Sequence, residues 1–352
     1  MTPSSWGYGA VDPRSSEAQQ VGLARQVMAA DLVVHDDGRA RGTRCVLLQN
    51  DRIAIEVIVD RGMDIGRARI EQLPIAWASP TGIVAPGLLE QRGSEFLRGF
   101  HGGLLTTCGL DHIGHPTERA ATRFNYEPRS VEQLPMHGRV SGIPATLTGY
   151  GVRASADGLE AFVEGVVSQI AIFGEHLTLT RRVSIRYGSA EIRIDDTVAN
   201  NGYAPSPLAA MYHVNIGWPT FAPGALINIG GTPTSGDVVR EVLPPTPDTA
   251  QSVTIYSITA DRDGRGMAEI VNERLSGQVG GGARLSWDTR ALPSLVRWQL
   301  ANVAGHYVLG LEPNTGRPGP DGLSFPILAP GESRKLGLTI ELLKFQREDR
   351  GG

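Results

Sequence analysis

Cysteine is scarce in this sequence: Cys45 and Cys108 are the only two among 352 residues. Two cysteines are too few for a disulfide framework, and too few for a zinc site built from thiolates alone. Long apolar runs are also lacking, since no stretch approaches the roughly 18 residues of a membrane span and the N-terminus has no signal-peptide core. These absences predict a cytoplasmic protein with free thiols and no membrane partner.

An excess of positive charge is lacking too. The chain carries 33 basic and 37 acidic residues, for a formal net charge of −4. No overall basic field exists to hold a phosphate backbone, so nucleic acid is not expected as a partner. The GxSxG, P-loop, HExxH and GxGxxG patterns are missing as well, which argues against most standard hydrolases, kinases, zinc proteases and dinucleotide-binding enzymes.

Glycine and proline, by contrast, are abundant and spread along the whole chain. The 44 glycines and 23 prolines make up about 19% of the residues, against an average usage of roughly 12%. Many short elements separated by turns are typical of all-β proteins. Residues 44–60 predict a hairpin around an Asn-Asp turn, and residues 145–157, 159–170, 176–187 and 190–200 predict further strands.

Alternation within these segments indicates strands with one buried and one wet face, as where Ile192 and Ile194 alternate with Arg193 and Asp195. No composition shift, charge run or fixed repeat divides the chain. The sequence therefore predicts one large antiparallel β-sandwich over residues 26–347. Residues 1–25 are expected to form a surface extension, with a short helix within residues 16–28.

Residues 80–130 differ from the rest because neither a strand nor a helix period is sustained. Long irregular segments inside a compact domain are usually binding loops. This one contains five polar residues of interest: Arg98, His101, Asp111, His112 and His115.

Three other segments combine ionisable residues with glycine or proline: MHGRVSGIP with His137 and Arg139, MYHVNIGWP with His213, Asn215 and Trp218, and LGLEPNTG with Glu312. A lone histidine in a β-protein is more often structural than catalytic. Glu312 ends an apolar strand, where a carboxylate is costly unless it is paired or functional. An arginine partner such as Arg317 would make it an ordinary salt bridge. The RGMDIG segment, Arg61 to Gly66, is interpreted as a structural turn in which Arg61 and Asp64 pair.

The order of these motifs resembles the aldose 1-epimerase, or galactose mutarotase-like, superfamily, within a bacterial group largely classed as a domain of unknown function. The resemblance runs from about residue 30 to 345 and rests on VIVDRGMDIGRA, GGLLTTCGL, MHGRVSGIPA, MYHVNIGWP, LGLEPNTG and LAPGESRKLGLTIEL. It implies the galactose mutarotase-like supersandwich and an enzyme that interconverts sugar anomers by acid–base ring opening.

The resemblance also implies roles. Ring opening needs a base that takes the anomeric hydroxyl proton and an acid that protonates the ring oxygen. Glu312 matches the base, His213 the acid, and His137 a hydrogen-bonding partner of the sugar. Trp218 is a candidate stacking platform for the sugar. The arginine that such enzymes carry before the His137 motif has no single match here, and Arg98, His101 and Asp111 are the candidates. Arg139 and Asn215 complete the expected sugar contacts.

Two alternatives stay open. No cofactor is expected, but a divalent metal bound among His101, His112, His115, His137, His213 and Glu312 would polarise a carbonyl and suit an isomerase, an epimerase at another carbon or a lyase acting on a keto-sugar. A non-catalytic sugar-binding protein on the same fold is the second, because fold alone assigns no activity. A homo-oligomer is also open, since exposed sheet edges are often covered by a partner.

Overall fold

The computed structural model describes residues 23–121, 130–155, 158–236, 238, 241–273, 275, 279–320 and 322–346. In these ranges the only α-helix is α1 (Phe96–Gly99), accompanied by four short 3-10 turns. None of the described helices is long and apolar enough to cross a membrane. Nearly everything else with regular structure is antiparallel strand, which confirms the all-β prediction.

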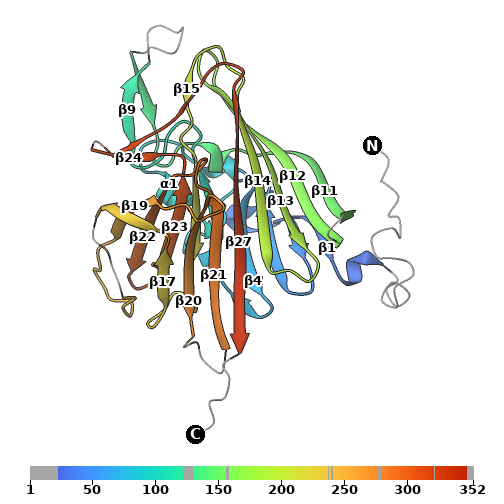
Figure 1. Cartoon of the computed structure of the whole chain (residues 1–352). Helices are drawn as coiled ribbons and strands as arrows, with labels where there is room; N and C mark the ends of the chain where they lie inside the picture. The colour runs from blue at the N-terminus through green and yellow to red at the C-terminus, as the bar shows by residue number, and fades with distance from the viewer. Residues whose placement is uncertain are drawn as a thin grey trace.

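Two sheets dominate the molecule (Figure 1). The first, called the large sheet, has eleven strands, which run in the order β1 (Ala29–Val34), β2 (Arg44–Gln49), β3 (Ile53–Ile58), β4 (Asp64–Ile70), β8 (Leu105–Cys108), β16 (Met211–Ile216), β23 (Tyr307–Asn314), β22 (Ser294–Ala301), β19 (Ser252–Ile258) and β18 (Gly231–Ser235), with β5 (Leu73–Pro74) beside β4.

The second sheet has eight strands, in the order β11 (Thr146–Ser155), β12 (Gly158–Ile170), β13 (His176–Arg186), β14 (Glu191–Asn200), β27 (Ser333–Gln346), β21 (Val279–Asp288), β20 (Arg265–Asn272) and β17 (Leu226–Ile229). Four strand pairs stand apart: β6 (Trp77–Ala78) with β7 (Gly102–Gly103), β9 (Thr117–Ala120) with β10 (Val131–Leu134), β15 (Ser206–Pro207) with β26 (Ile327–Leu328), and β24 (Arg317–Gly319) with β25 (Gly322–Ser324).

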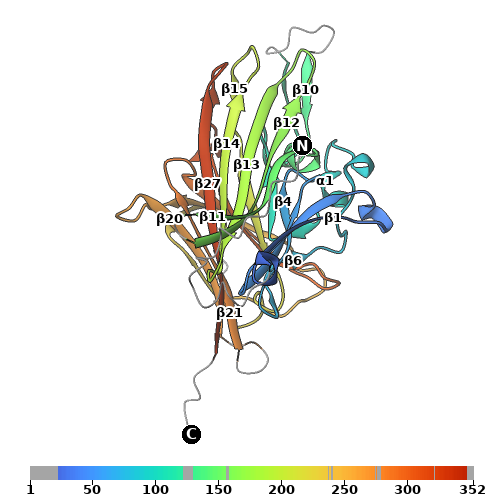
Figure 2. The ribbon, with the colours of Figure 1, turned by 90° about the vertical axis from the view of Figure 1, so that its right-hand side faces the viewer.

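The sheets face each other, and Figure 2 shows them as two layers with α1 beside the large sheet. Each strand sends alternate apolar residues into the space between them. Val214 and Leu311 from the large sheet share one buried cluster with Ile194 and Leu338 from the second sheet. Residues one position along, such as His213 and Glu312, therefore lie on the outer face of the large sheet.

A buried polar network also connects the two sheets. The guanidinium of Arg181, which is fully buried, donates to both carboxylate oxygens of Asp196 at 2.9 and 2.6 Å. Tyr212 donates its hydroxyl to the same carboxylate at 2.7 Å, and Arg181 also donates to the Thr107 hydroxyl at 2.6 Å. Because Tyr212 precedes His213 on β16, this network holds the strand that carries the histidine.

Several predictions from the sequence are confirmed here. The hairpin of β2 and β3 forms where expected, and its turn is held by the Asn50 side chain, which accepts from the backbone amides of Arg52 and Ile53. The strands β11 to β14 lie within two residues of their predicted ranges. Both cysteines are buried and free. The expected extension over residues 1–25 lies mostly outside the described residues. Most of the helix expected within residues 16–28 also lies outside the described residues. In its described part, only the 3-10 turn η1 (Ala24–Gln26) is helical.

Candidate active site

His213 and Glu312 form a buried pair on the outer face of the large sheet. Strands β16 and β23 pair with Val214 opposite Leu311, a register that sets His213 opposite Glu312. Nε2 of His213 lies 3.1 Å from Oε1 of Glu312, and the two side chains are only 4% and 3% exposed. Among the described residues the ion-pair partner of Glu312 is thus His213 and not Arg317.

Burial shapes the protonation of this pair. It raises the pKa of the Glu312 carboxyl well above its ordinary 4.5. The pKa of His213 is held well below its ordinary 6.5, mainly by burial and further by the nearby imidazole of His137. Burial disfavours the charged form of each group. The pair therefore carries one proton between two neighbouring groups and no net charge.

Aromatic side chains cover the pair. The ring of Phe100, just after α1, lies 5.1 Å from the ring of His213, and Trp298 of β22 lies 5.5 Å from it. Trp77 and Phe96 extend this cluster, with ring centroids 5.6 and 4.9 Å from Phe100. The aromatic cover, meaning these four residues, excludes water from both polar groups.

His137 approaches the same place from a loop. Its ring centroid lies 5.7 Å from that of His213 and 4.9 Å from that of Phe96. Its backbone has a φ of 57°, a left-handed conformation that is rare for residues other than glycine and concentrates at functional sites. The loop is held by backbone hydrogen bonds from His137 to Gly114 and from Gly109 to His137, both 2.9 Å.

The electrostatic surroundings of His137 favour its neutral form. Burial, assisted by His112 and His115, lowers the pKa of His137 to about 4. Its Nδ1 accepts a weak hydrogen bond of 3.4 Å from the Gly114 amide. The neutral ring therefore carries its proton on Nε2, where it can donate to a ligand.

Gly310 makes room for the pair. It lies on β23 opposite Trp298 and Asn215. A Cβ at this position would lie 2.5 Å from Oε1 of Glu312 and 3.2 Å from Cε1 of His213. Any larger residue at position 310 would displace the Glu312 carboxyl from its place beside the His213 imidazole.

Unpaired polar atoms occur in the pair and on the strands and loop beside it. Among the described residues, buried atoms without a hydrogen-bond partner include both ring nitrogens of His101, Nδ1 of His213, Oδ1 of Asn215 and Oε1 of Glu312. The 3.1 Å contact of Oε1 with His213 is thus close but not aligned as a hydrogen bond. Asn215 donates its amide to the carbonyls of Gly102 and His213. Buried polar groups are normally satisfied, so this concentration is typical of a site that receives a polar ligand.

Other sequence-predicted residues are exposed or have partners outside the pair. The side chain of Arg98 is 78% exposed and pairs with Glu95, and Trp218 is 68% exposed beyond the end of β16. Asp111 is buried, but it accepts from Arg119 and Gln169. Arg139 donates to the carbonyl of Gln133.

Of the predicted metal set, His137, His213 and Glu312 lie near one another, but among the described residues no three of its members place ligand atoms within 4.8 Å of one another. His112 makes a 2.8 Å hydrogen bond from its ring to the carbonyl of His115. Among the described residues, the group of three metal-ligand side chains with atoms within 4.8 Å of one another lies elsewhere, at His35, Cys45 and Glu56.

Arg61, interpreted from the sequence as a partner of Asp64, instead connects loops around the site. Its guanidinium donates to the carbonyls of Ser141, Val84 and Gly99 at 2.7, 3.1 and 3.0 Å. Asp64 accepts from the Thr107 amide and the Ser141 hydroxyl. Arg61 thereby ties the segment leading into α1 to the loop that carries His137.

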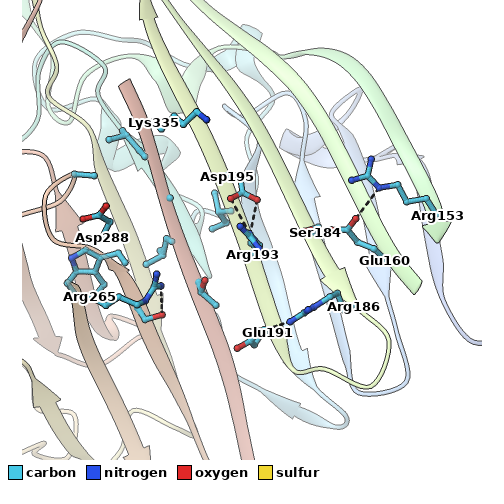
Figure 3. A pocket seen from close by; sticks show the side chains of 18 residues that line it. Arg153, Glu160, Ser184, Arg186, Glu191, Arg193, Asp195, Arg265, Asp288 and Lys335 are labelled. Atoms are coloured by element: carbon cyan, nitrogen blue, oxygen red, sulfur yellow. Dashed lines mark hydrogen bonds and ion pairs between the residues drawn. The ribbon is translucent and has the colours of Figure 1, made fainter. Parts of the chain in front are cut away.

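Two hollows of the described surface lie away from the pair. One of about 720 Å³ lies on the outer face of the second sheet (Figure 3). Its charged side chains largely pair with each other, as Arg193 does with Asp195 and Arg186 with Glu191. A smaller hollow of about 30 Å³ lies beside Phe96 and Arg61. Neither of these two hollows is lined by His213 or Glu312, whose side chains are only 4% and 3% exposed.

Neither the aromatic cover nor Gly310 was predicted from the sequence. Trp77 and Trp298 lie far from the histidine motifs in sequence, and only strand order brings them to His213. The pattern GLE did offer a signal for Gly310, because two positions along a strand lie on the same face.

Comparisons with known proteins agree with this architecture. Residues 40–342 match the family described as Domain of unknown function (DUF4432), and the chain belongs to that family. No curated protein matches the sequence. The fold is that of the galactose mutarotase-like proteins.

Among solved structures, a candidate aldose 1-epimerase from Klebsiella pneumoniae is similar with a TM-score of 0.76 and 24% identity, over 89% of this chain and 83% of the other. A galactose mutarotase-like protein from Clostridium acetobutylicum is similar with a TM-score of 0.62 and 14% identity, over 91% and 99% of the two chains. A candidate aldose 1-epimerase from Escherichia coli K12 has a TM-score of 0.54 and 14% identity, over 86% and 99%.

Proposed function

We propose that this DUF4432 protein is an aldose 1-epimerase-like enzyme that interconverts the anomers of a sugar or sugar derivative. The observation that carries the proposal is the buried pair of His213 and Glu312, surrounded by polar atoms without partners. The mutarotase-like fold of the chain and the names of its structural neighbours support the same chemistry.

The reaction requires two proton transfers, one at each of the two oxygens bonded to the anomeric carbon C1. Glu312 takes the proton of the anomeric hydroxyl as the C1–O1 bond becomes a carbonyl, and the bond between C1 and the ring oxygen breaks. His213 delivers a proton to that ring oxygen. Rotation about C1–C2 and the reverse transfers close the ring with the other configuration. Both oxygens are bonded to C1, so an acid and a base side by side on one sheet face suit the reaction.

The raised pKa of Glu312 and the lowered pKa of His213 place the single proton of the pair on the carboxyl at rest. The proposed roles therefore require that proton to pass to His213 across the 3.1 Å contact before the sugar reacts. A single proton is present, as the reaction needs, because one group must give while the other takes. The raised pKa of Glu312 makes its carboxylate, once formed, a stronger base than an exposed glutamate. His137, neutral with a proton on Nε2, is suited to donate to a sugar hydroxyl. The indole faces of Trp77 and Trp298 can contact the C–H faces of a sugar.

The two alternatives have less support. A metal-assisted isomerase, epimerase or lyase needs several ligands near the reacting carbon, and among the described residues no three potential ligands at His213 have their ligand atoms within 4.8 Å of one another. A non-catalytic binder has no need of a buried acid–base pair beside a glycine that makes room for it.

Substitution of Glu312 by glutamine tests the proposal. Glutamine keeps the shape but cannot accept the proton, so anomeric exchange should fall to the uncatalysed rate while sugar binding, measured by ligand-observed NMR, remains. The matched control is Glu191→Gln on the outer face of the second sheet, which should leave exchange unchanged. Equal rates in Glu312→Gln and the wild type would remove the proposed base.

A further inference from the structure

Three potential metal ligands meet at the β1 edge of the large sheet. His35 follows β1, Cys45 lies on β2 and Glu56 on β3. Strands β4 and β8 separate these positions from β16 and the catalytic pair. Val46 and Val57, the neighbours of Cys45 and Glu56, belong to the core between the sheets. Cys45 and Glu56 therefore project from the opposite face, on which His35 joins them.

The donor atoms of this group are placed for a common ligand. One atom from each side chain lies within 4.8 Å of the others, and Nε2 of His35 is 3.2 Å from Oε1 of Glu56. Tetrahedral sites place their ligand atoms at comparable separations, because zinc lies about 2.0–2.3 Å from each donor. Nε2 of His35 is itself buried and has no hydrogen-bond partner, so its contact with the carboxylate is close without being aligned.

The cluster is largely buried and already has one cation, Arg67, beside its carboxylate. Glu56 is 2% exposed and Cys45 fully buried. Arg67 donates to both carboxylate oxygens of Glu56, at 3.1 and 3.2 Å. Burial, together with Glu56 and Asp60, raises the pKa of the Cys45 thiol. A divalent ion reverses that effect, because a coordinated thiol loses its proton.

We propose that His35, Cys45 and Glu56 bind a divalent transition-metal ion of the zinc type, with a fourth position left to water. Imidazole, thiolate and carboxylate together match the ligand preferences of zinc. Arg67 remains hydrogen-bonded to Glu56 from outside the ligand set and orients its carboxylate. The side chain of His35 is 29% exposed, which gives an ion a route from solvent.

The ion would hold the segment that leads to the aromatic cover. His35 begins a turn closed by its backbone hydrogen bonds to Thr43 and Gly42. Within this turn, Arg39 accepts from the Ala85 amide through its carbonyl and donates to the Arg98 carbonyl through its guanidinium. Residues 85–98 lead directly into Phe100. The site is therefore structural. It fixes the turn that is hydrogen-bonded to the segment leading into the aromatic cover.

Titration with Co²⁺, which reports on its ligands by absorption, tests the proposal. Metal-free full-length protein should bind one equivalent, show a thiolate-to-cobalt charge-transfer band and release about one proton per ion. Zn²⁺ should displace the cobalt and raise the melting temperature, because it binds the folded state. Cys108→Ser is the matched control, since it removes the other buried thiol and should leave the band intact.

Cys45→Ser should abolish the charge-transfer band, and His35→Gln should weaken binding by at least about 100-fold. His35 is partly exposed, so its variant tests the site even if Cys45→Ser fails to fold. The proposal is overturned by a band that survives Cys45→Ser, or by cobalt affinity that is unchanged in His35→Gln. It is also overturned if the wild type binds no ion, in which case the thiol of Cys45 merely donates to Glu56.

Discussion

Replacement of Gly310 by alanine should disable the active site while leaving the fold in place. The new methyl group would lie 2.5 Å from Oε1 of Glu312, whereas ordinary contact begins at 3.4 Å, so the carboxyl must move by about 0.9 Å. A misplacement near 1 Å costs on the order of 100-fold in rate. We therefore expect kcat/KM for anomeric exchange to fall about 100-fold, equivalent to about 2.7 kcal/mol of transition-state stabilisation.

Folding and activity can be separated in this experiment. Overpacking should lower the free energy of unfolding by about 1–3 kcal/mol, which denaturant melts will measure. Gly149→Ala on β11 is the matched control, because its Cβ would meet only ordinary contacts, 3.7 Å from Phe162 and 3.8 Å from Glu164. A folded Gly310→Ala protein that exchanges anomers at the wild-type rate would refute the placement of Glu312 as the base.

Three further outcomes are expected. The pH profile of kcat/KM should be bell-shaped, because the pair works with one proton. Activity should fall at low pH, where the pair gains a second proton on His213, at a pH below the ordinary histidine pKa of 6.5. It should also fall at high pH, where the pair loses its single proton from Glu312, at a pH above the ordinary glutamate pKa of 4.5. A rate that rises with pH and never falls would contradict this. Arg181→Met should lower the free energy of unfolding by about 3–5 kcal/mol, because it leaves the buried Asp196 carboxylate without its cation; a loss below 1 kcal/mol in denaturant melts would show that the network is not needed. Trp218→Ala should leave sugar affinity unchanged, since that side chain is exposed; a weaker affinity in titrations would restore it to the site.

The sequence could predict those features that are local. Alternation of apolar and polar residues along β14 places Ile192 and Ile194 in the core, and the Asn-Asp turn predicts the β2–β3 hairpin. The all-β class follows from such patterns. Motif order then singled out His213 and Glu312, which the register of β16 and β23 sets opposite each other.

Features that depend on strand order could not be predicted in this way. Trp298 reaches His213 only because β22 lies beside β23 in the large sheet. Trp218 shares a motif with His213, but β16 ends at Ile216. The side chain of Trp218, beyond the end of the strand, is exposed to solvent. Arg98 belongs to the expected binding segment, yet it pairs with Glu95 three residues earlier and faces solvent. Sequence proximity to a motif is thus a poor guide to which side chains enter the site.

The most direct test of the proposed function is exchange spectroscopy of anomeric protons with a panel of aldoses and the purified wild-type protein. We expect at least one sugar to exchange faster than in buffer, and the excess rate to disappear in Glu312→Gln. Exchange at the buffer rate for every sugar, with binding detected for some, would contradict it and favour a sugar-binding protein built on the same fold.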